Sequence, residues 1–239
     1  ERAEVARGFQ EALARCRTFW LGGDTGTGRS TVLGGVGLGL CQRKPLSRMG
    51  LRPGQILCVS GQVGNGPALA IRYLLEQADE EFLEKDFRPV ARLEAGQALL
   101  GLATAAMDTS DGVLSTLNTL SLLNGSGMEL VWRPELISAP ARAYCAKHGI
   151  PEWLLWEVEH GDYQLIFGIA EENLEKAKVL VPDMTPIGRV VEQQQMSLTL
   201  PDGASRTVDP GFARSLLASG DYRSALKELI RHSKERGMP

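Results

Sequence analysis

The sequence lacks the features that define several large classes of protein. No apolar run reaches the length of a membrane span, since the apolar stretch over residues 32–40 is short and rich in glycine. The formal net charge is −3 at pH 7, so no basic excess favours nucleic acid or an anionic membrane surface as a partner. The first residues are charged and helical in pattern, which is not the pattern of a signal peptide.

Several catalytic signatures are missing as well. The four cysteines and three histidines stand apart, without the spacing that is typical of a zinc site. There is no Gly-x-Ser-x-Gly elbow of a serine hydrolase, and the glycine-rich loop at 61–67 lacks the Lys-Ser/Thr ending of a P-loop. That loop is therefore either a phosphate-binding turn or only a turn before a helix. Scattered cysteines are typical of reduced thiols, so we expect a cytoplasmic protein.

Helical and strand patterns alternate along the chain, which predicts an α/β or α+β fold. Apolar residues over 222–230 form one stripe, which predicts either a helix docked on its own domain or a helix that binds a partner. The helical patterns cover residues 1–16, 68–75, 92–103, 113–123 and 171–180. The strand patterns cover residues 18–21, 31–40, 56–60, 128–131, 164–169 and 185–191, with an edge hairpin at 196–203.

The rest of the chain is organised around residues 105–112, where an apolar lead-in ends in two carboxylates, Asp108 and Asp111. We expect Asp108 at the end of a strand, and Ser110 or Asp111 as the cap of the helix that follows. A helix cap alone is one interpretation. The other is a site for Mg²⁺ on a nucleotide, because Asp24 lies in a second glycine-rich turn and this ion prefers carboxylate oxygens.

Three motifs in the chain follow one another in the order found in a known family: Gly22-Gly23-Asp24-Thr25, then Met107 to Gly112, then Gly161-Asp162-Tyr163-Gln164-Leu165. The family patterns are GGDT, MDISDGL and GGEDYEL, and residues 45–54 match a further segment that precedes a strand. Over residues 1–200 the sequence therefore resembles the thiamine-monophosphate kinases, which belong to the aminoimidazole-ribotide synthetase superfamily of ATP-using enzymes. The segment from Asp86 to Pro89 resembles a connector of the same family.

The resemblance implies ATP-dependent and Mg²⁺-dependent transfer of a phosphoryl group to a small-molecule phosphate monoester, in a homodimer. It implies an aminoimidazole-ribotide-synthetase-like fold in which residues 1–46 are a remnant of an N-terminal dimer-barrel domain. Residues 47–205 would form the C-terminal α/β domain, and residues 206–239 a helical tail. By the same resemblance, the metal ligands are Asp24, Asp108 and Asp111, the nucleotide contacts are Gly23, Asp24, Arg48 and Ser110, and the substrate contacts are Asp162 and Tyr163. Without the resemblance, Arg48 would be an exposed surface arginine as readily as an ATP contact.

Two departures from the family qualify these expectations. Gly161 stands where the family has a glutamate that contacts thiamine, so we expect a different acceptor site, unless Glu159 reaches the same place by a shifted loop. The chain also begins with Glu1 inside a helical pattern, and no carboxylate in the first 23 residues has a suitable setting for a metal. We therefore expect an upstream part to be missing and residues 1–239 alone not to turn over ATP.

Two further interpretations stay open at this point. One is another ATP-using enzyme of the superfamily that acts on a different acceptor. The other is a non-catalytic module that keeps the fold and serves as a scaffold for a dimer or a partner. Magnesium-dependent nucleotide binding would separate the enzymes from the scaffold, and substrate screening would separate the two enzymes.

Overall fold

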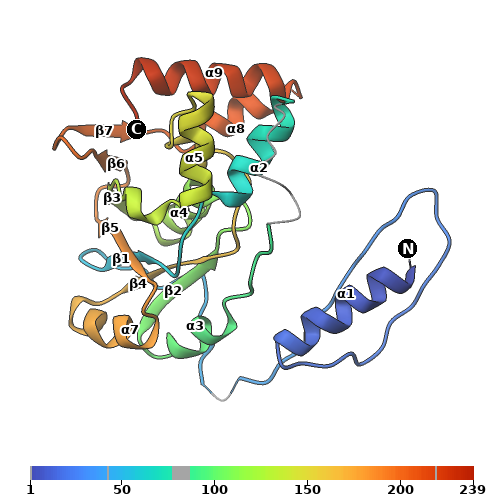
Figure 1. Ribbon diagram of the computed structural model, residues 1–239. Helices are drawn as coiled ribbons and strands as arrows, with labels where there is room; N and C mark the ends of the chain where they lie inside the picture. Colours follow the sequence, from blue (N-terminus) through green and yellow to red (C-terminus); the bar gives the residue numbers. More distant parts are fainter. Residues whose placement is uncertain (1, 42, 77–86, 219) are drawn as a thin grey trace. The chain divides into compact units, whose positions relative to one another are not determined.

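The computed structural model describes residues 2–41, 43–76, 87–218 and 220–239. The chain divides into two compact units, residues 1–42 and residues 43–239 (Figure 1). The first residue of the family-like connector, Asp86, lies outside the described residues, and residues 87–90 have no regular secondary structure. Among the described helices, none combines the length and the apolarity that crossing a bilayer requires.

The first unit contains the expected N-terminal helix, α1 (Arg2–Arg15), none of whose residues is buried. The prediction of strands over residues 18–21 and 31–40 is wrong, because residues 18–41 contain no strand. Apolar side chains in this segment, such as Leu21, Val36 and Leu40, are exposed. An apolar run becomes a strand only when another strand takes up its backbone hydrogen bonds, and the described residues of this unit provide none.

The second unit is built on a seven-stranded sheet in the order β2-β4-β1-β5-β3-β6-β7. Neighbouring strands are antiparallel, except that β3 pairs with β6 in parallel. The expected edge hairpin is confirmed as β6 and β7. The strands are β1 (Ile56–Val59), β2 (Ala103–Asp108), β3 (Gly127–Val131), β4 (Leu165–Ile169), β5 (Thr185–Val191), β6 (Met196–Thr199) and β7 (Ser205–Val208).

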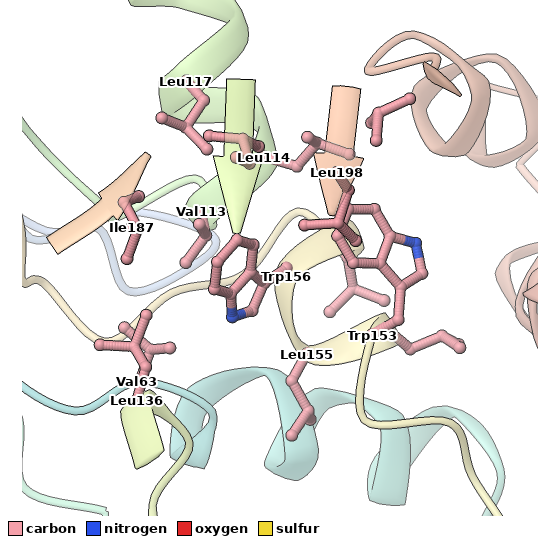
Figure 2. Close-up of a cluster of buried hydrophobic side chains, with 14 of the residues drawn as sticks. Val63, Val113, Leu114, Leu117, Leu136, Trp153, Leu155, Trp156, Ile187 and Leu198 are labelled. Carbon is pink, nitrogen blue, oxygen red and sulfur yellow. The ribbon is translucent and has the colours of Figure 1, made fainter. Parts of the chain in front are cut away.

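Helices cover both faces of this sheet, so the unit has an α/β/α arrangement. Alternate residues of β1 show the two faces: Leu57 and Val59 belong to a larger apolar core, and Ile56 and Cys58 to a smaller one. Figure 2 shows part of the larger core, with Trp156 at its centre. The larger core takes side chains from α2 (Asn65–Leu74), α4 (Val113–Asn124), α5 (Ala139–His148), α6 (Leu154–Glu157), α8 (Phe212–Leu217) and α9 (Tyr222–Glu235). The smaller takes them from α3 (Leu93–Ala98) and α7 (Leu174–Leu180), which follows the short 3₁₀ helix η3 (Glu171–Asn173).

Two expectations about helices meet different outcomes. The prediction of a helix over residues 92–103 is wrong for its second half. The helix α3 ends at Ala98, and Ala103 already belongs to β2. The turn between them passes through Gly101 at φ 82°, a conformation that ends a helix. In the tail, α9 buries Leu226 and Leu229 in the larger core, so it docks on its own unit.

Candidate functional site

The ends of β1 and β2 and the start of β4 lie side by side at one end of the strands and hold the candidate site together. Because β1 and β2 both run antiparallel to β4, their carboxyl ends lie beside the start of β4. After β2, the Thr109 N–H donates to the Gln164 carbonyl (2.7 Å), and Thr109 Oγ1 accepts from the Gln164 N–H (3.0 Å). After β1, the Ser60 N–H donates to the Leu165 carbonyl (2.9 Å), and Ser60 Oγ accepts from the Leu165 N–H (2.9 Å).

The strand end at Asp108 forms a tight turn into α4. The Gly112 N–H donates to the Thr109 carbonyl (3.0 Å), and Asp108 Oδ2 accepts from the Ser110 N–H (3.1 Å). The expected helix cap is wrong for both Ser110 and Asp111: the N-cap is Gly112, at φ 88°, with no side-chain cap. Glycine is needed here because the left-handed backbone strains any other residue. Asp111 is left exposed.

The charge around Asp108 favours its ionised form. Burial raises the pKa of Asp108, but hydrogen bonds from Ser110 and the nearby Arg48 guanidinium outweigh burial, and the net pKa lies below the ordinary value. Arg48 lies on an exposed segment that Asn124 fixes, because Asn124 Nδ2 donates to the Arg48 carbonyl (2.9 Å) and Asn124 Oδ1 accepts from the Gly50 N–H (2.7 Å). The structure therefore brings Arg48, Asp108 and Ser110 together.

Asp162, by contrast, is buried and bound by backbone. Its Oδ2 accepts from the Gly64 N–H (2.6 Å) and its Oδ1 from the Gly66 N–H (2.8 Å), at the start of α2. Burial raises the pKa of Asp162, and the backbone N–H groups oppose that rise. With both oxygens occupied by α2, this carboxylate holds the loop before β4 in place, and its neighbour Tyr163 is the side chain left half-exposed.

Three glycines bring this loop into direct backbone contact with its neighbours. A Cβ on Gly161 would lie 1.4 Å from the Thr109 carbonyl oxygen, so the family glutamate would not fit this loop as it stands. A Cβ on Gly66 would lie 2.4 Å from the Gly161 oxygen, and one on Gly112 would lie 2.4 Å from the Val158 oxygen. The loop that carries Tyr163, the Asp108 turn and the start of α2 are thus packed backbone to backbone.

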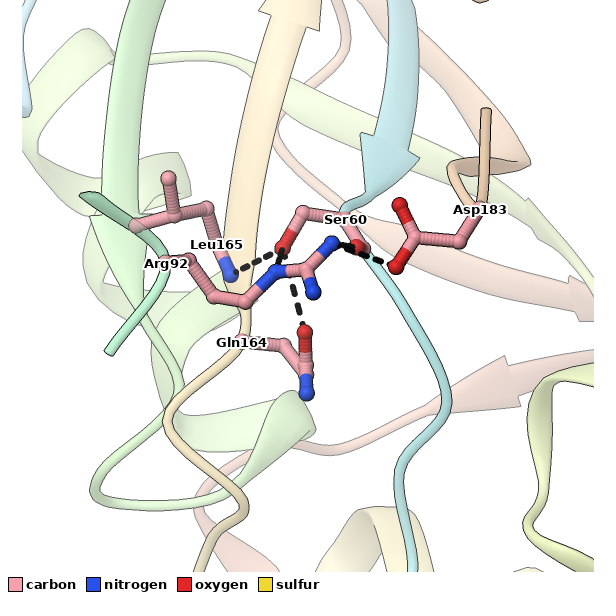
Figure 3. Close-up of polar contacts among 5 residues, drawn as sticks. All are labelled: Ser60, Arg92, Gln164, Leu165 and Asp183. Atoms are coloured by element: carbon pink, nitrogen blue, oxygen red, sulfur yellow. Dashed lines mark hydrogen bonds and ion pairs between the residues drawn. The ribbon is translucent and has the colours of Figure 1, made fainter. Parts of the chain in front are cut away.

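Figure 3 shows a polar network behind the site, centred on the fully buried Ser60. Arg92, just before α3, donates from Nε to Ser60 Oγ (3.3 Å) and from Nη2 to the Ser60 carbonyl, and it forms an ion pair with Asp183 (2.6 Å). Ser60 Oγ also donates to Gln164 Oε1 (3.2 Å). Sequence reasoning missed this network, because a serine after a strand and an arginine before a helix give no signal until the pairing of β1 with β4 is known.

A cavity of about 440 Å³ opens beside Asp108. Tyr163, at φ 59°, forms part of its wall. The rest of the lining comes from the start of β4 and from α3 with the residues next to it: Ala91, Arg92, Leu93, Gly96, Gln97, Leu100 and Leu165.

The remaining predicted residues, Gly23 and Asp24, lie in the first unit. They form an exposed turn that lines a hollow together with Trp20, Leu21 and Thr25, and Asp24 Oδ1 accepts from the Thr25 N–H (2.8 Å). The oxygen donors of Asp108 and Asp111 suit Mg²⁺ chemically. No group of three or more His, Cys, Asp or Glu side chains among the described residues is arranged to hold a metal ion.

Comparison with known proteins identifies relatives of the chain. No protein-family profile matches the sequence. The thiamine-monophosphate kinase of Escherichia coli K12 is 30% identical over 201 residues, which is 79% of this chain and 61% of the relative. That of Pyrococcus abyssi is 29% identical over 188 residues, covering 78% and 58%. The chain thus spans about 60% of the length of these relatives.

Solved structures extend the comparison to the fold. Thiamine-monophosphate kinase from Aquifex aeolicus superposes with a TM-score of 0.55 at 29% identity, over 69% of this chain and 55% of that one. The complex of AaThiL with AMPPCP and TMP gives the same TM-score and identity over 66% and 51%. The hydrogenase maturation protein HypE of E. coli gives a TM-score of 0.56 at 22% identity, which shows the fold alone. The chain is therefore a homologue of the thiamine-monophosphate kinases, with the aminoimidazole-ribotide-synthetase-like fold that they share with HypE.

Proposed function

We propose that this protein transfers the terminal phosphoryl group of ATP to a phosphate monoester, with thiamine monophosphate as the first acceptor to test. The observation that carries the proposal is the Asp108 turn, where an ionised carboxylate, Ser110 and Arg48 gather at one strand end. Phosphoryl transfer depends mostly on positioning and on neutralising charge, and these side chains supply both. Similarity to thiamine-monophosphate kinases over 79% of the chain supports the same reaction.

Each residue of the site has a role under this proposal. Bound Mg²⁺ would neutralise charge on the transferred phosphoryl group, and Asp108 and Asp111 would hold it. Arg48 and Ser110 would bind the nucleotide. Tyr163 would contact the acceptor, and Asp162 would serve the acceptor by fixing the loop that carries Tyr163, since its own oxygens bind α2.

The acceptor side differs from the family pattern at Gly161. Glu159, which could replace the missing glutamate through a shifted loop, forms an ion pair with Arg214 of α8 (2.6 Å), and Arg214 also donates to Ser115 Oγ (3.2 Å). The Glu159 carboxylate therefore faces α8 and is not at the position of the family glutamate. We therefore expect a cationic thiazolium ring to find no carboxylate at position 161, and thiamine monophosphate to be phosphorylated inefficiently. Efficient phosphorylation of thiamine monophosphate by the protein would contradict this.

We further propose that the protein works as a homodimer in the cytoplasm. The first part rests on the resemblance to the family. The second rests on the four cysteines, Cys16, Cys41, Cys58 and Cys145, all of which are free thiols. Sedimentation at several protein concentrations would test the dimer, since a concentration-independent monomer would refute it.

Calorimetric titration with Mg-ATP tests the proposed function. Asp111→Asn is expected to weaken binding by about tenfold or more, because each removed charge weakens a metal site built from few carboxylates. Asp202→Asn, an exposed carboxylate in the β6–β7 turn, is the matched control and should bind as the wild type does. If Asp111→Asn binds Mg-ATP with unchanged affinity and heat, the turn only shapes the backbone and the proposal fails.

A further inference from the structure

The Asp108 turn lies between two segments of the chain that have to keep a fixed spacing. On one side is the loop of residues 158–163, which packs on the turn without intervening side chains. A Cβ on Gly112 would lie 2.4 Å from the Val158 oxygen, and one on Gly161 would lie 1.4 Å from the Thr109 oxygen. On the other side is α4, which begins directly after Gly112. A movement of this loop relative to the start of α4 therefore deforms the turn.

Arg214 of α8 joins these two segments. Its Nε donates to Glu159 Oε1 in the loop (2.6 Å), and its Nη2 donates to Ser115 Oγ in the first turn of α4 (3.2 Å). The guanidinium group is planar and rigid, so its two donors keep a fixed distance from each other. The bridge therefore sets how far the Glu159 loop lies from the start of α4.

The helix that carries Arg214 has a firm base. Ala213 is buried in the larger core, and the Phe212 ring packs on the His232 ring of α9 with the two centroids 4.3 Å apart. The Arg214 side chain itself is 62% exposed, and exposed ion pairs contribute little to the stability of a fold. The loss of this arginine should therefore leave the protein folded and loosen only the spacing that the bridge sets.

We propose that Arg214 is a positioning residue for the Asp108 turn: by holding Glu159 and Ser115 together, it keeps the turn in the shape that binds Mg-ATP. The inference rests on the proposed function for the identity of the ligand. It adds the C-terminal tail to the framework of that site, because α8 is the element that supplies the bridge. Arg214 acts through Glu159 and Ser115, and it contacts neither the metal nor the nucleotide.

The test is calorimetric titration of the full 239-residue chain with Mg-ATP. Arg214→Ala and Glu159→Ala should each weaken binding by about fivefold, although they change the charge in opposite directions. The double variant should bind about as tightly as either single variant, because all three lack the same bridge. Arg214→Lys keeps the charge but has one nitrogen in place of the fork, so it should also weaken binding. If charge alone mattered, Glu159→Ala would bind the anionic nucleotide more tightly and Arg214→Lys would bind it normally.

Hydrogen exchange follows the same bridge without a nucleotide. The Ser110 N–H donates to Asp108 Oδ2, and the Gly112 N–H donates to the Thr109 carbonyl, so both amides report on the turn. They should exchange about fivefold faster in Arg214→Ala and in Glu159→Ala than in the wild type. The midpoint of urea unfolding should stay close to that of the wild type in both variants, because the ion pair is exposed.

Arg231→Ala is the matched control. Arg231 is a similarly exposed arginine of the same tail, and it pairs with Glu228 and Glu235 within α9. Its loss removes one positive charge and one set of exposed ion pairs without touching the bridge. It should change neither the affinity for Mg-ATP nor the exchange of the two amides.

The inference and the proposed function fail in different ways. A wild type that binds no Mg-ATP refutes the proposed function, and hydrogen exchange then decides by itself whether Arg214 positions the turn. Unchanged exchange of Ser110 and Gly112 in Arg214→Ala overturns the inference whatever the titration shows. Mg-ATP binding that is the same in the wild type and in Arg214→Ala overturns it as well, and so does tighter binding by Glu159→Ala.

Discussion

Glu157 is a buried carboxylate whose ionisation should weaken the folded protein. It lies at the end of α6, where Ser233 of α9 donates to its Oε2 (3.4 Å). Burial raises the pKa of Glu157 to about 7, although hydrogen bonds from Trp153 and Ser233 and the charge of Arg236 oppose the rise. In the unfolded chain the same carboxyl group has its ordinary pKa of 4.5. The folded state therefore holds this proton more tightly than the unfolded state does.

The sign of the pH effect follows from that difference. Below pH 4.5 both states carry the proton, and Glu157 makes no difference to the free energy of unfolding. As the pH rises from 4.5 through 7, the carboxyl group ionises in the unfolded state but stays protonated in the folded state. The free energy of unfolding therefore falls. At pH values above both, the loss amounts to about 3 kcal/mol. Glu157→Gln cannot ionise and should escape this loss.

Urea unfolding at pH 5 and pH 8, followed by tryptophan fluorescence, measures the effect. Trp132, Trp153 and Trp156 have ring centroids 5.2–6.3 Å apart and report on the same core. Wild type and Glu157→Gln should differ by less than about 1 kcal/mol at pH 5, and the variant should be more stable by about 3 kcal/mol at pH 8. Glu172→Gln, an exposed glutamate in η3, serves as the control. A difference that stays constant or shrinks as the pH rises would refute the reasoning.

Three other changes test the arrangement of the site. Asp162→Ala leaves two buried N–H groups at the start of α2 without an acceptor and should lower the free energy of unfolding by about 3 kcal/mol. The stability of Asp162→Asn should lie between that of the alanine variant and that of the wild type. An alanine variant as stable as the wild type would contradict the role of Asp162 as the acceptor for these N–H groups. Gly161→Ala should cost on the order of 3 kcal/mol in urea unfolding, because its methyl group would overlap the Thr109 oxygen, whereas Gly8→Ala, with nothing within 4 Å, should cost nothing. The 239-residue chain alone should show no magnesium-dependent ATP turnover, since its described residues hold no cluster of three metal-binding side chains. Magnesium-dependent ATP turnover by this chain would contradict that last expectation.

The position of Asp108 could be predicted because local pattern decides it. An apolar run that changes to helical spacing fixes a strand end, and β2 and α4 meet there as expected. The cap could not be predicted in the same way, because Ser110 and Asp111 are both good capping residues and only the φ of Gly112 shows that neither is used. The strand patterns of residues 18–21 and 31–40 failed because pairing, which a single segment cannot supply, decides whether a strand forms.

Roles that depend on distant contacts were beyond reach of the sequence. Asp162 lies 98 and 96 residues from the two N–H groups that it binds, so its place in a kinase-like motif said nothing about α2. Arg92 and Asp183 are 91 residues apart and meet because Asp183 precedes β5, which pairs with β1, and Arg92 is bound to Ser60 at the end of β1. The resemblance to a family assigned Asp108 to a metal and Ser110 and Arg48 to a nucleotide, and these roles stay predictions.

The backbone contact among Gly66, Gly112 and Gly161 also constrains how the protein folds. These glycines come from three parts of the chain that are about 50 residues apart, so their contact closes long loops and should form late. Once this contact has formed, none of the three segments that carry Gly66, Gly112 and Gly161 can move away without breaking its contact with the others. The amide hydrogens of Gly64, Gly66 and Thr109 should then exchange with solvent only when the whole second unit unfolds, although Gly64 and Thr109 lie in loops and Gly66 in the first turn of α2, where amides ordinarily exchange quickly.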